Sequence, residues 1–126
     1  MKLNHLDLQV SDVQRTVALF EELFGFRLQS SRSSPALAIL TDGEGFTLVL
    51  QRRKSETEAY PDGFHVGFLV ADQDVVRDFH ARAQGRGLDV SQVIENGRGV
   101  LVYCRTWDGL LIEVSWHRNE RSSPQA

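Results

Sequence analysis

The sequence predicts an α+β protein built from two βαβββ modules that follow one another along the chain. The first reason is a repeated strand pattern, LNHLDLQV at residues 3–10 and GFHVGFLV at residues 63–70, in which His5 and His65 stand 60 residues apart. Apolar residues alternate in both segments, which is the period of a half-buried strand. The second reason is an amphipathic helix after each strand, whose apolar positions recur at a constant offset of 59 residues. These positions are Val17, Phe20 and Phe24 in the first helix and Val76, Phe79 and Ala83 in the second.

The composition is that of a soluble globular protein of one domain. The 126 residues are 41% hydrophobic and 25% charged, with a net charge of −3 at pH 7, which gives no reason to expect nucleic acid or an anionic membrane as a partner. No apolar run reaches membrane-spanning length and the N-terminus lacks the pattern of a signal peptide, so we expect a cytoplasmic protein. The single cysteine, Cys104, follows the apolar run VLVY and is expected to be a buried strand residue.

The first module is expected to open with the strand that carries His5 and to continue into a helix that begins after Ser11 and runs through residues 16–24. Ser11 has the side chain of a helix cap, and Gly25 can end the helix. The turn-forming sequence DGEG at residues 42–45 then separates two strands of the module. Three strands are expected after the helix, over residues 26–30, 36–40 and 46–51.

The second module repeats this order from the strand that carries His65. Its helix is expected to begin at Asp72 and to end at the glycines of residues 85–87. Strands are expected over residues 88–94, 99–105 and 110–116, with Asn96 and Gly97 forming the first hairpin turn. We therefore divide the chain into module one over residues 1–52, a polar linker over residues 53–62, module two over residues 63–117 and a loose tail over residues 118–126.

Three polar side chains interrupt the apolar strands and form a candidate metal site. Glu113 stands in the apolar strand LLIEVSW, where an unpaired carboxylate is costly and needs a cationic partner or a metal. His5 and His65 occupy equivalent places in the repeat. Each residue alone is more often an ordinary core or surface residue, but together they form a set of two histidines and one carboxylate on helix-free strand faces. Such a set binds a divalent ion and leaves positions open for water or substrate.

Four motifs in this order resemble those of the vicinal oxygen chelate superfamily, which includes glyoxalases, extradiol dioxygenases, fosfomycin thiol transferases and bleomycin-resistance proteins. The resemblance covers residues 2–116, and each motif alone is weak. It implies the glyoxalase/bleomycin resistance/dioxygenase fold, in which two βαβββ modules form a cup-shaped mixed sheet. The motifs are LNHL at residues 3–6, LFGF at residues 23–26, FHV at residues 64–66 and WDGLLIE at residues 107–113.

The resemblance places metal ligands on the first and fourth strands of each module, which here means His5, His65 and Glu113. Aligning the glycine before each fourth strand puts Val49 opposite Glu113, so the second carboxylate of glyoxalase I is absent. Gln51 can take that place only if the register slips. Three protein ligands resemble the pattern of the extradiol dioxygenases and of the fosfomycin thiol transferases. Against the dioxygenases, this sequence has no histidine near Val49 to serve as their acid–base group.

The same resemblance suggests residues that contact the substrate. Tyr103 resembles a tyrosine beside the substrate and would position it or transfer a proton, although a plain sheet aromatic is nearly as good an interpretation. Leu101 and Arg105 share its face of the strand, while Val49 and Gln51 line the same cup. Asp7 is a candidate base. Arg105 and Asp7 can equally be substrate contacts or a structural ion pair.

We therefore expect a metal-dependent enzyme, either a lyase, a ring-cleaving dioxygenase or a thiol transferase, that acts on a small molecule with vicinal oxygens. The cofactor would be a divalent ion of iron, manganese, zinc, nickel or cobalt. The alternative is a non-catalytic antibiotic-binding protein like the bleomycin-resistance proteins, which usually lack the metal triad. In this family two chains commonly complete each cup, so we also expect a homodimer, with a small-molecule substrate or drug as the other partner.

Overall fold

The structure of the protein is a computed structural model that describes residues 1–29 and 34–118. The chain divides into two compact units, unit 1 (Met1–Ala59) and unit 2 (Tyr60–Ala126). Unit 1 follows the expected βαβββ order, unit 2 follows it with one additional short strand, and the α+β class is confirmed. The two described helices, of 11 and 13 residues, are too short and too polar to cross a membrane.

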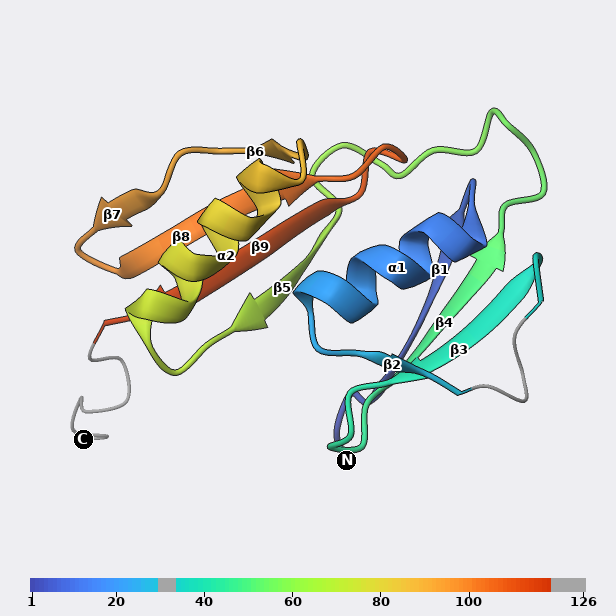
Figure 1. Ribbon diagram of the computed structural model, residues 1–126, viewed down its shortest axis with the longest axis horizontal. Helices are drawn as coiled ribbons and strands as arrows, with labels where there is room; N and C mark the ends of the chain where they lie inside the picture. The colour runs from blue at the N-terminus through green and yellow to red at the C-terminus, as the bar shows by residue number, and fades with distance from the viewer. Residues whose placement is uncertain (30–33, 119–126) are drawn as a thin grey trace. The chain divides into compact units, whose positions relative to one another are not determined.

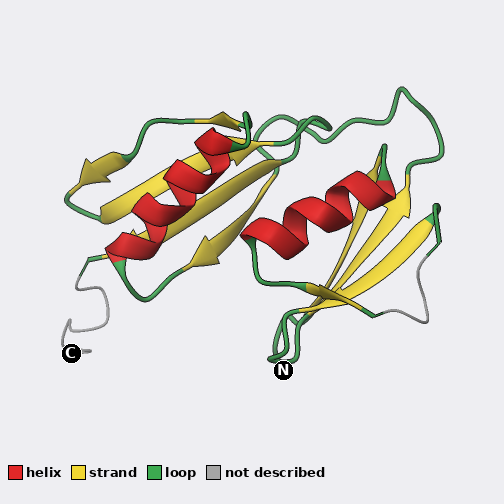
Figure 2. Ribbon diagram, in the orientation of Figure 1, coloured by secondary structure: helices red, strands yellow, loops and turns green. Residues whose placement is uncertain are grey.

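Unit 1 is a four-stranded sheet with one helix against it (Figures 1 and 2). The strand order is β1-β4-β3-β2, in which β1 runs parallel to β4 and the other neighbours are antiparallel. The side chains that face the helix form the core, whereas His5, Asp7 and Gln9 alternate onto the opposite face of β1 and are exposed. The elements are β1 (His5–Val10), α1 (Val13–Leu23), β2 (Arg27–Leu28), β3 (Leu37–Thr41) and β4 (Thr47–Arg52).

Helix α1 begins one residue later than the predicted cap implies. Its cap is Asp12, whose carboxylate accepts a hydrogen bond of 3.0 Å from the backbone N–H of Arg15. The prediction of Ser11 as the cap was therefore wrong by one residue. The helix ends as expected, because Gly25 adopts a φ of 75°, a conformation that favours glycine. Residue 30 of the second expected strand lies outside the described residues.

Unit 2 repeats this architecture with one additional short strand (Figure 1). The order is β5-β9-β8-β6, with β7 paired to β8, and β5 runs parallel to β9. Val76, Phe79 and Ala83 of the helix are buried, as the repeat predicts. The elements are β5 (His65–Leu69), α2 (Gln73–Gly85), β6 (Asp89–Val90), β7 (Ile94–Asn96), β8 (Gly99–Arg105) and β9 (Leu111–His117).

One predicted strand of unit 2 is broken. The segment over residues 88–94 forms β6 and the first residue of β7, and the residues between them belong to neither strand. The backbone N–H of Ser91 still donates to the carbonyl of Tyr103 at 2.8 Å. At the break, the hydroxyl of Ser91 accepts the backbone N–H of Tyr103 at 3.0 Å, in place of a backbone carbonyl. The hairpin turn also lies one residue later than expected, because Asn96 pairs with Gly99 and its side chain accepts from the N–H of Arg98. Apart from Arg118, the expected loose tail over residues 118–126 lies outside the described residues.

Each sheet has one face that packs against its helix and one helix-free face. The packed face of unit 2 includes Cys104, which is 1% exposed, so the expected burial of this thiol is confirmed. Burial, followed by the charge of Asp89, raises the pKa of the Cys104 thiol to about 11. The polar residues singled out in the sequence lie on the helix-free faces, so these two faces define where a site can form.

Candidate functional site

The helix-free face of the unit 2 sheet carries His65 and Glu113. Because residues paired across neighbouring strands point to the same face, the register of β5, β9 and β8 arranges this face in three rows. Glu113 occupies the centre of the middle row, with a glycine on one side and a tyrosine on the other. The rows are His65, Leu111 and Arg105; Gly67, Glu113 and Tyr103; and Leu69, Ser115 and Leu101.

His65 and Glu113 face each other within this grid. The Nε2 atom of His65 lies 3.8 Å from Oε1 of Glu113, and the two side chains are 47% and 21% exposed. The distance is too long for a hydrogen bond. Among the described residues, His65 is the only potential cation within ion-pair distance of this half-buried carboxylate.

The other ring nitrogen of His65 identifies the tautomer. Nδ1 lies 2.9 Å from the backbone carbonyl oxygen of Gly63. A carbonyl oxygen only accepts hydrogen bonds, so Nδ1 must carry the proton. In the neutral ring, Nε2 then presents a lone pair toward the carboxylate of Glu113. Two electron-rich atoms facing each other favour a cation between them.

This donor pair fits a divalent transition-metal ion. Bonds from such an ion to imidazole nitrogen and carboxylate oxygen are about 2.0–2.2 Å long, so two donors that share one ion lie at most about 4.2 Å apart, when they are on opposite sides of it. The separation of 3.8 Å between His65 and Glu113 falls within that reach. Over residues 1–29 and 34–118, no group of three or more histidine, cysteine, aspartate or glutamate side chains is arranged to hold a metal. The pair alone therefore offers two donors, one fewer than the site predicted from the sequence.

The third predicted ligand, His5, is an exposed residue at the start of β1 in unit 1. Asp7 follows it on the same face and accepts two hydrogen bonds from glutamine side-chain amides. Nε2 of Gln51 donates to Oδ2 at 2.7 Å, and Nε2 of Gln9 donates to Oδ1 at 3.1 Å. The helix-free face of unit 1 therefore carries a histidine beside a carboxylate that is already engaged by amides.

The register of the two units settles which residues correspond. In unit 1, Asp7 pairs with Val49 across the parallel strands β1 and β4. In unit 2, Gly67 pairs with Glu113 across β5 and β9. Val49 is therefore the counterpart of Glu113. The register does not slip, so Gln51 does not take that position. Val49 is 9% exposed and has no metal-binding group.

The remaining predicted residues lie on the helix-free face of unit 2. Tyr103 and Leu101 are half-buried, and Tyr103 is the direct cross-strand neighbour of Glu113. Arg105 is exposed, and its Nη1 donates a 3.0 Å hydrogen bond to the carbonyl of Gly109 in the turn before β9. Arg105 therefore has a structural contact within its own unit. A guanidinium has four other N–H groups, which remain able to bind an anionic group.

Sequence reasoning missed the contact between His65 and the turn that precedes it. Phe64 donates its backbone N–H to the carbonyl of Pro61 at 3.1 Å, and the rings of Tyr60 and Phe64 stack with centroids 5.5 Å apart. Burial, together with the charge of Asp108, raises the pKa of Tyr60 to about 12. Tyr60 is therefore a neutral aromatic support at physiological pH. The signal in the sequence was the turn-forming Pro61-Asp-Gly, which predicts a turn but not the carbonyl contact to His65.

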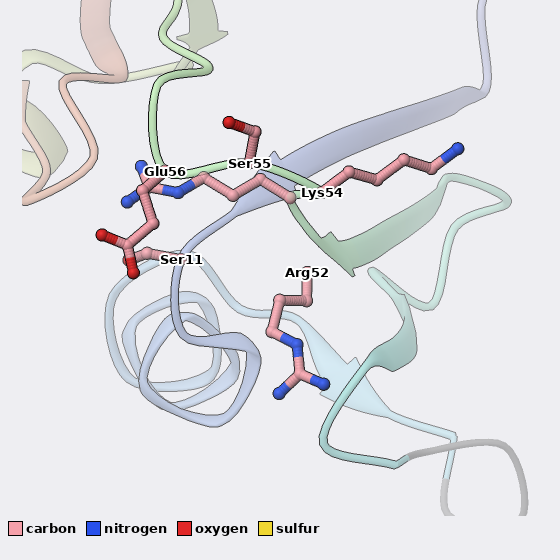
Figure 3. A pocket seen from close by; sticks show the side chains of 6 residues that line it. Ser11, Arg52, Lys54, Ser55 and Glu56 are labelled. Carbon is pink, nitrogen blue, oxygen red and sulfur yellow. The ribbon is translucent and has the colours of Figure 1, made fainter.

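A separate hollow of about 260 Å³ in unit 1 is lined by polar side chains. Figure 3 shows that the side chains of Arg52 and Lys54 point to different sides, while Glu56 lies beside Ser11. The charges of Arg52 and Lys54 therefore do not converge on one point, and the carboxylate of Glu56 lines the same hollow. The lining residues are Ser11, Arg52, Arg53, Lys54, Ser55 and Glu56.

Two successive βαβββ-type units, the second with a histidine–carboxylate pair on its helix-free sheet face, are typical of the glyoxalase fold. The family model described as Glyoxalase/Bleomycin resistance protein/Dioxygenase superfamily matches residues 2–114. The chain belongs to this superfamily, so the resemblance found in the sequence is confirmed. A comparison with curated proteins gave no match.

Solved structures of the same fold span nearly the whole chain. A structure of a possible glyoxalase from Bacillus cereus is 29% identical with a TM-score of 0.79, covering 91% of this chain and 98% of that one. The fosfomycin resistance protein FosX from Listeria monocytogenes, solved with Mn(II) and sulfate, is 21% identical with a TM-score of 0.76, covering 94% and 92%. Lactoylglutathione lyase from Agrobacterium tumefaciens is 17% identical with a TM-score of 0.71, covering 91% and 92%.

Proposed function

We propose that the protein is a metal-dependent enzyme that acts on a small molecule with two adjacent oxygen atoms. The ligands would be His5, His65 and Glu113. The observation that carries this proposal is the His65–Glu113 pair, in which the Nε2 lone pair faces a half-buried carboxylate at 3.8 Å. Nothing in the packing of β9 requires a carboxylate at this place, whereas a cation would satisfy both donors.

The donor set favours a first-row transition metal. Two imidazoles and one carboxylate suit iron(II), manganese, cobalt, nickel or zinc, and three protein ligands leave coordination positions open. The Listeria FosX protein, which has the same fold, was solved with Mn(II). A divalent cation held here would supply Lewis-acid stabilisation of negative charge that develops on adjacent substrate oxygens.

Residues around this centre would bind the substrate and move protons. Tyr103 is the cross-strand neighbour of Glu113, and its hydroxyl can donate a hydrogen bond to a substrate oxygen or pass a proton. Asp7 would serve as a base, because each of its oxygens accepts one amide and keeps a second lone pair. Leu101, Val49 and Gln51 would contact the rest of the substrate, and Arg105 would contact an anionic group.

Metal titration tests the ligand set directly. The purified protein, stripped with a chelator, is titrated with Mn(II), Co(II) and Zn(II) by calorimetry. We expect one site per chain in the wild type and at least 100-fold weaker binding in His5→Ala, His65→Ala and Glu113→Ala. His80→Ala is the matched control, because His80 lies on α2 and not on a helix-free sheet face. Unchanged tight binding in any of the three ligand variants would remove that residue from the site.

A second experiment distinguishes an enzyme of this kind from an antibiotic-binding protein. Catechol has two adjacent oxygens that can occupy neighbouring open positions, whereas phenol has one. The metal-loaded protein should bind catechol at least tenfold more tightly than phenol, and the stripped protein should not distinguish them. Equal binding of both compounds in both forms would contradict the enzyme proposal and favour a protein that binds its ligand by stacking and shape.

A further inference from the structure

We infer that the backbone carbonyl of Gly63 is a positioning group that sets the tautomer of His65 and directs its Nε2 lone pair toward Glu113. This inference rests on the proposed metal-binding function. The hydrogen bond from Nδ1 of His65 to the Gly63 oxygen is 2.9 Å long. Because the acceptor is a carbonyl, the bond exists only in the tautomer that leaves Nε2 unprotonated.

The turn around Gly63 holds this carbonyl in place. The backbone N–H of Phe64 bonds to the Pro61 carbonyl at 3.1 Å, which closes a four-residue turn. Gly63 has a φ of +84° in the third position of this turn, as a type II turn requires. The near-parallel rings of Tyr60 and Phe64, inclined by 6°, brace the turn from both ends. The carbonyl therefore belongs to an ordered element and not to a freely rotating peptide.

The ring of His65 needs this support because little else restrains it. Its side chain is 47% exposed, so packing alone leaves the ring free to rotate and both tautomers accessible. The other candidate histidine differs. In the repeat, Leu3 takes the place of Gly63 and is 86% exposed, and within the described part of the chain the His5 ring has no hydrogen bond.

This asymmetry predicts that unit 2 holds the preorganised half of the centre. A histidine that binds a metal commonly donates its other N–H to a carbonyl or carboxylate, and removing that outer hydrogen bond weakens metal binding by about 10- to 100-fold. The hydrogen bond from His65 to the Gly63 carbonyl should therefore strengthen metal binding by this factor, although Gly63 touches neither the metal nor the substrate.

The tautomer can be measured in the metal-free wild type without any variant. Two-bond ¹H–¹⁵N correlation spectra at alkaline pH separate Nδ1–H from Nε2–H rings, and His65→Gln assigns the signal among the four histidines. We expect His65 to be predominantly the Nδ1–H form. A predominant Nε2–H form would overturn the inference. Because the protein carries no metal in this measurement, its outcome is independent of whether the proposed function is right.

Gly63→Val tests the consequence for metal binding. Valine is strongly disfavoured at positive φ, so the turn must change and displace the carbonyl. Gly43→Val is the matched control, because Gly43 has a φ of +81° in a turn of unit 1, and at both positions an added Cβ meets nothing within 4 Å. Both variants thus place valine at a similar positive φ, and circular dichroism verifies that each is folded. If Gly63→Val does not fold, Gly63→Ala replaces it.

We expect Gly63→Val to increase the Nε2–H fraction of His65 and to weaken Mn(II) binding at least tenfold, while Gly43→Val changes the Mn(II) affinity less than twofold. An unchanged tautomer in Gly63→Val would contradict the inference. An altered tautomer with unchanged Mn(II) affinity would equally contradict it. If the wild type binds no metal but shows the Nδ1–H form, the tautomer assignment holds and the proposed metal function fails.

Discussion

Replacing Glu113 with glutamine should separate metal binding from stability. The side chain keeps its size but loses its charge, and the neutral amide is a poor metal ligand. Its only ion-pair partner in the described chain is His65 at 3.8 Å, and that histidine is 47% exposed. Two unit charges at this separation attract by about 1 kcal/mol in water, and the attraction is smaller when the imidazole is neutral. The metal-free variant should therefore unfold within about 1 kcal/mol of the wild type.

The metal-loaded proteins should differ much more. A ligand present at 100 times its dissociation constant stabilises the folded state by about 2.7 kcal/mol. For a chain of 126 residues, this increment corresponds to an increase in Tm of roughly 10 °C. Wild-type protein should gain this increment on addition of Mn(II), and Glu113→Gln should gain almost none. Thermal unfolding followed by circular dichroism, with and without Mn(II), measures both quantities.

Glu95→Gln is the control, because Glu95 is a carboxylate in ion pairs and is not among the proposed metal ligands. Glu95 forms ion pairs with Arg77 at 3.1 Å and with Arg118 at 3.5 Å on the surface of unit 2. Exposed pairs contribute about 0.2–1 kcal/mol each, so this variant should lose stability without metal and keep the full metal increment. A Glu113→Gln protein that still gains about 10 °C with Mn(II) would refute the role of Glu113 as a ligand.

Three further predictions follow from individual contacts. Burial raises the pKa of Cys104 from 9.0 to about 11, so the thiol ionises at lower pH in the unfolded chain than in the folded protein. The free energy of unfolding should therefore fall by up to about 3 kcal/mol as the pH rises from 9 to 11. Urea unfolding of Cys104→Val over the same pH range should not show this decrease. A Cβ at Gly67 would meet Glu113 at 3.8 and 3.9 Å, which is an ordinary contact. Gly67→Leu should therefore fold and bind Mn(II), but it should bind catechol at least tenfold more weakly than the wild type. Gly67→Ala should not weaken catechol binding in this way. If two chains share each centre, mixing His5→Ala with Glu113→Ala protein should restore Mn(II) binding at one site in two, and no restoration would place all ligands on one chain.

The strands and the repeat were predictable because their signals are periodic. Alternation of apolar residues placed His65 and Glu113 on helix-free faces, and both residues are there. Element ends were less predictable, because the choice between adjacent residues depends on a single hydrogen bond. Ser11 and Asp12 are both good caps, and the bond from the N–H of Arg15 selects Asp12. Likewise, the strand expected over residues 88–94 is interrupted after Val90, where the Ser91 hydroxyl accepts the backbone N–H of Tyr103.

The chemistry of the site was predictable only where it depends on residue type. The absence of a carboxylate at Val49 followed from aligning the glycines before the two fourth strands, and the register of β1 with β4 agrees with it. The hydrogen bond that sets the tautomer of His65 comes from a backbone carbonyl, which every residue has. The sequence shows that Gly63 can form a turn, but only the folded turn shows where its carbonyl points.

The carboxylates on the helix-free faces of the two units differ in position and in hydrogen bonding. In each parallel strand pair the middle row contains one carboxylate, but it lies on the first strand in unit 1, as Asp7 beside Val49, and on the last strand in unit 2, as Glu113 beside Gly67. The carboxylate of Asp7 is engaged by two glutamine amides, whereas no hydrogen bond to Glu113 is found in the described chain. A carboxylate with all its lone pairs available is the better metal ligand, because no other donor competes for them. If the proposed ligands are right, the repeat offers an equivalent histidine in each unit but an unengaged carboxylate only in unit 2, and three protein ligands would leave coordination positions open.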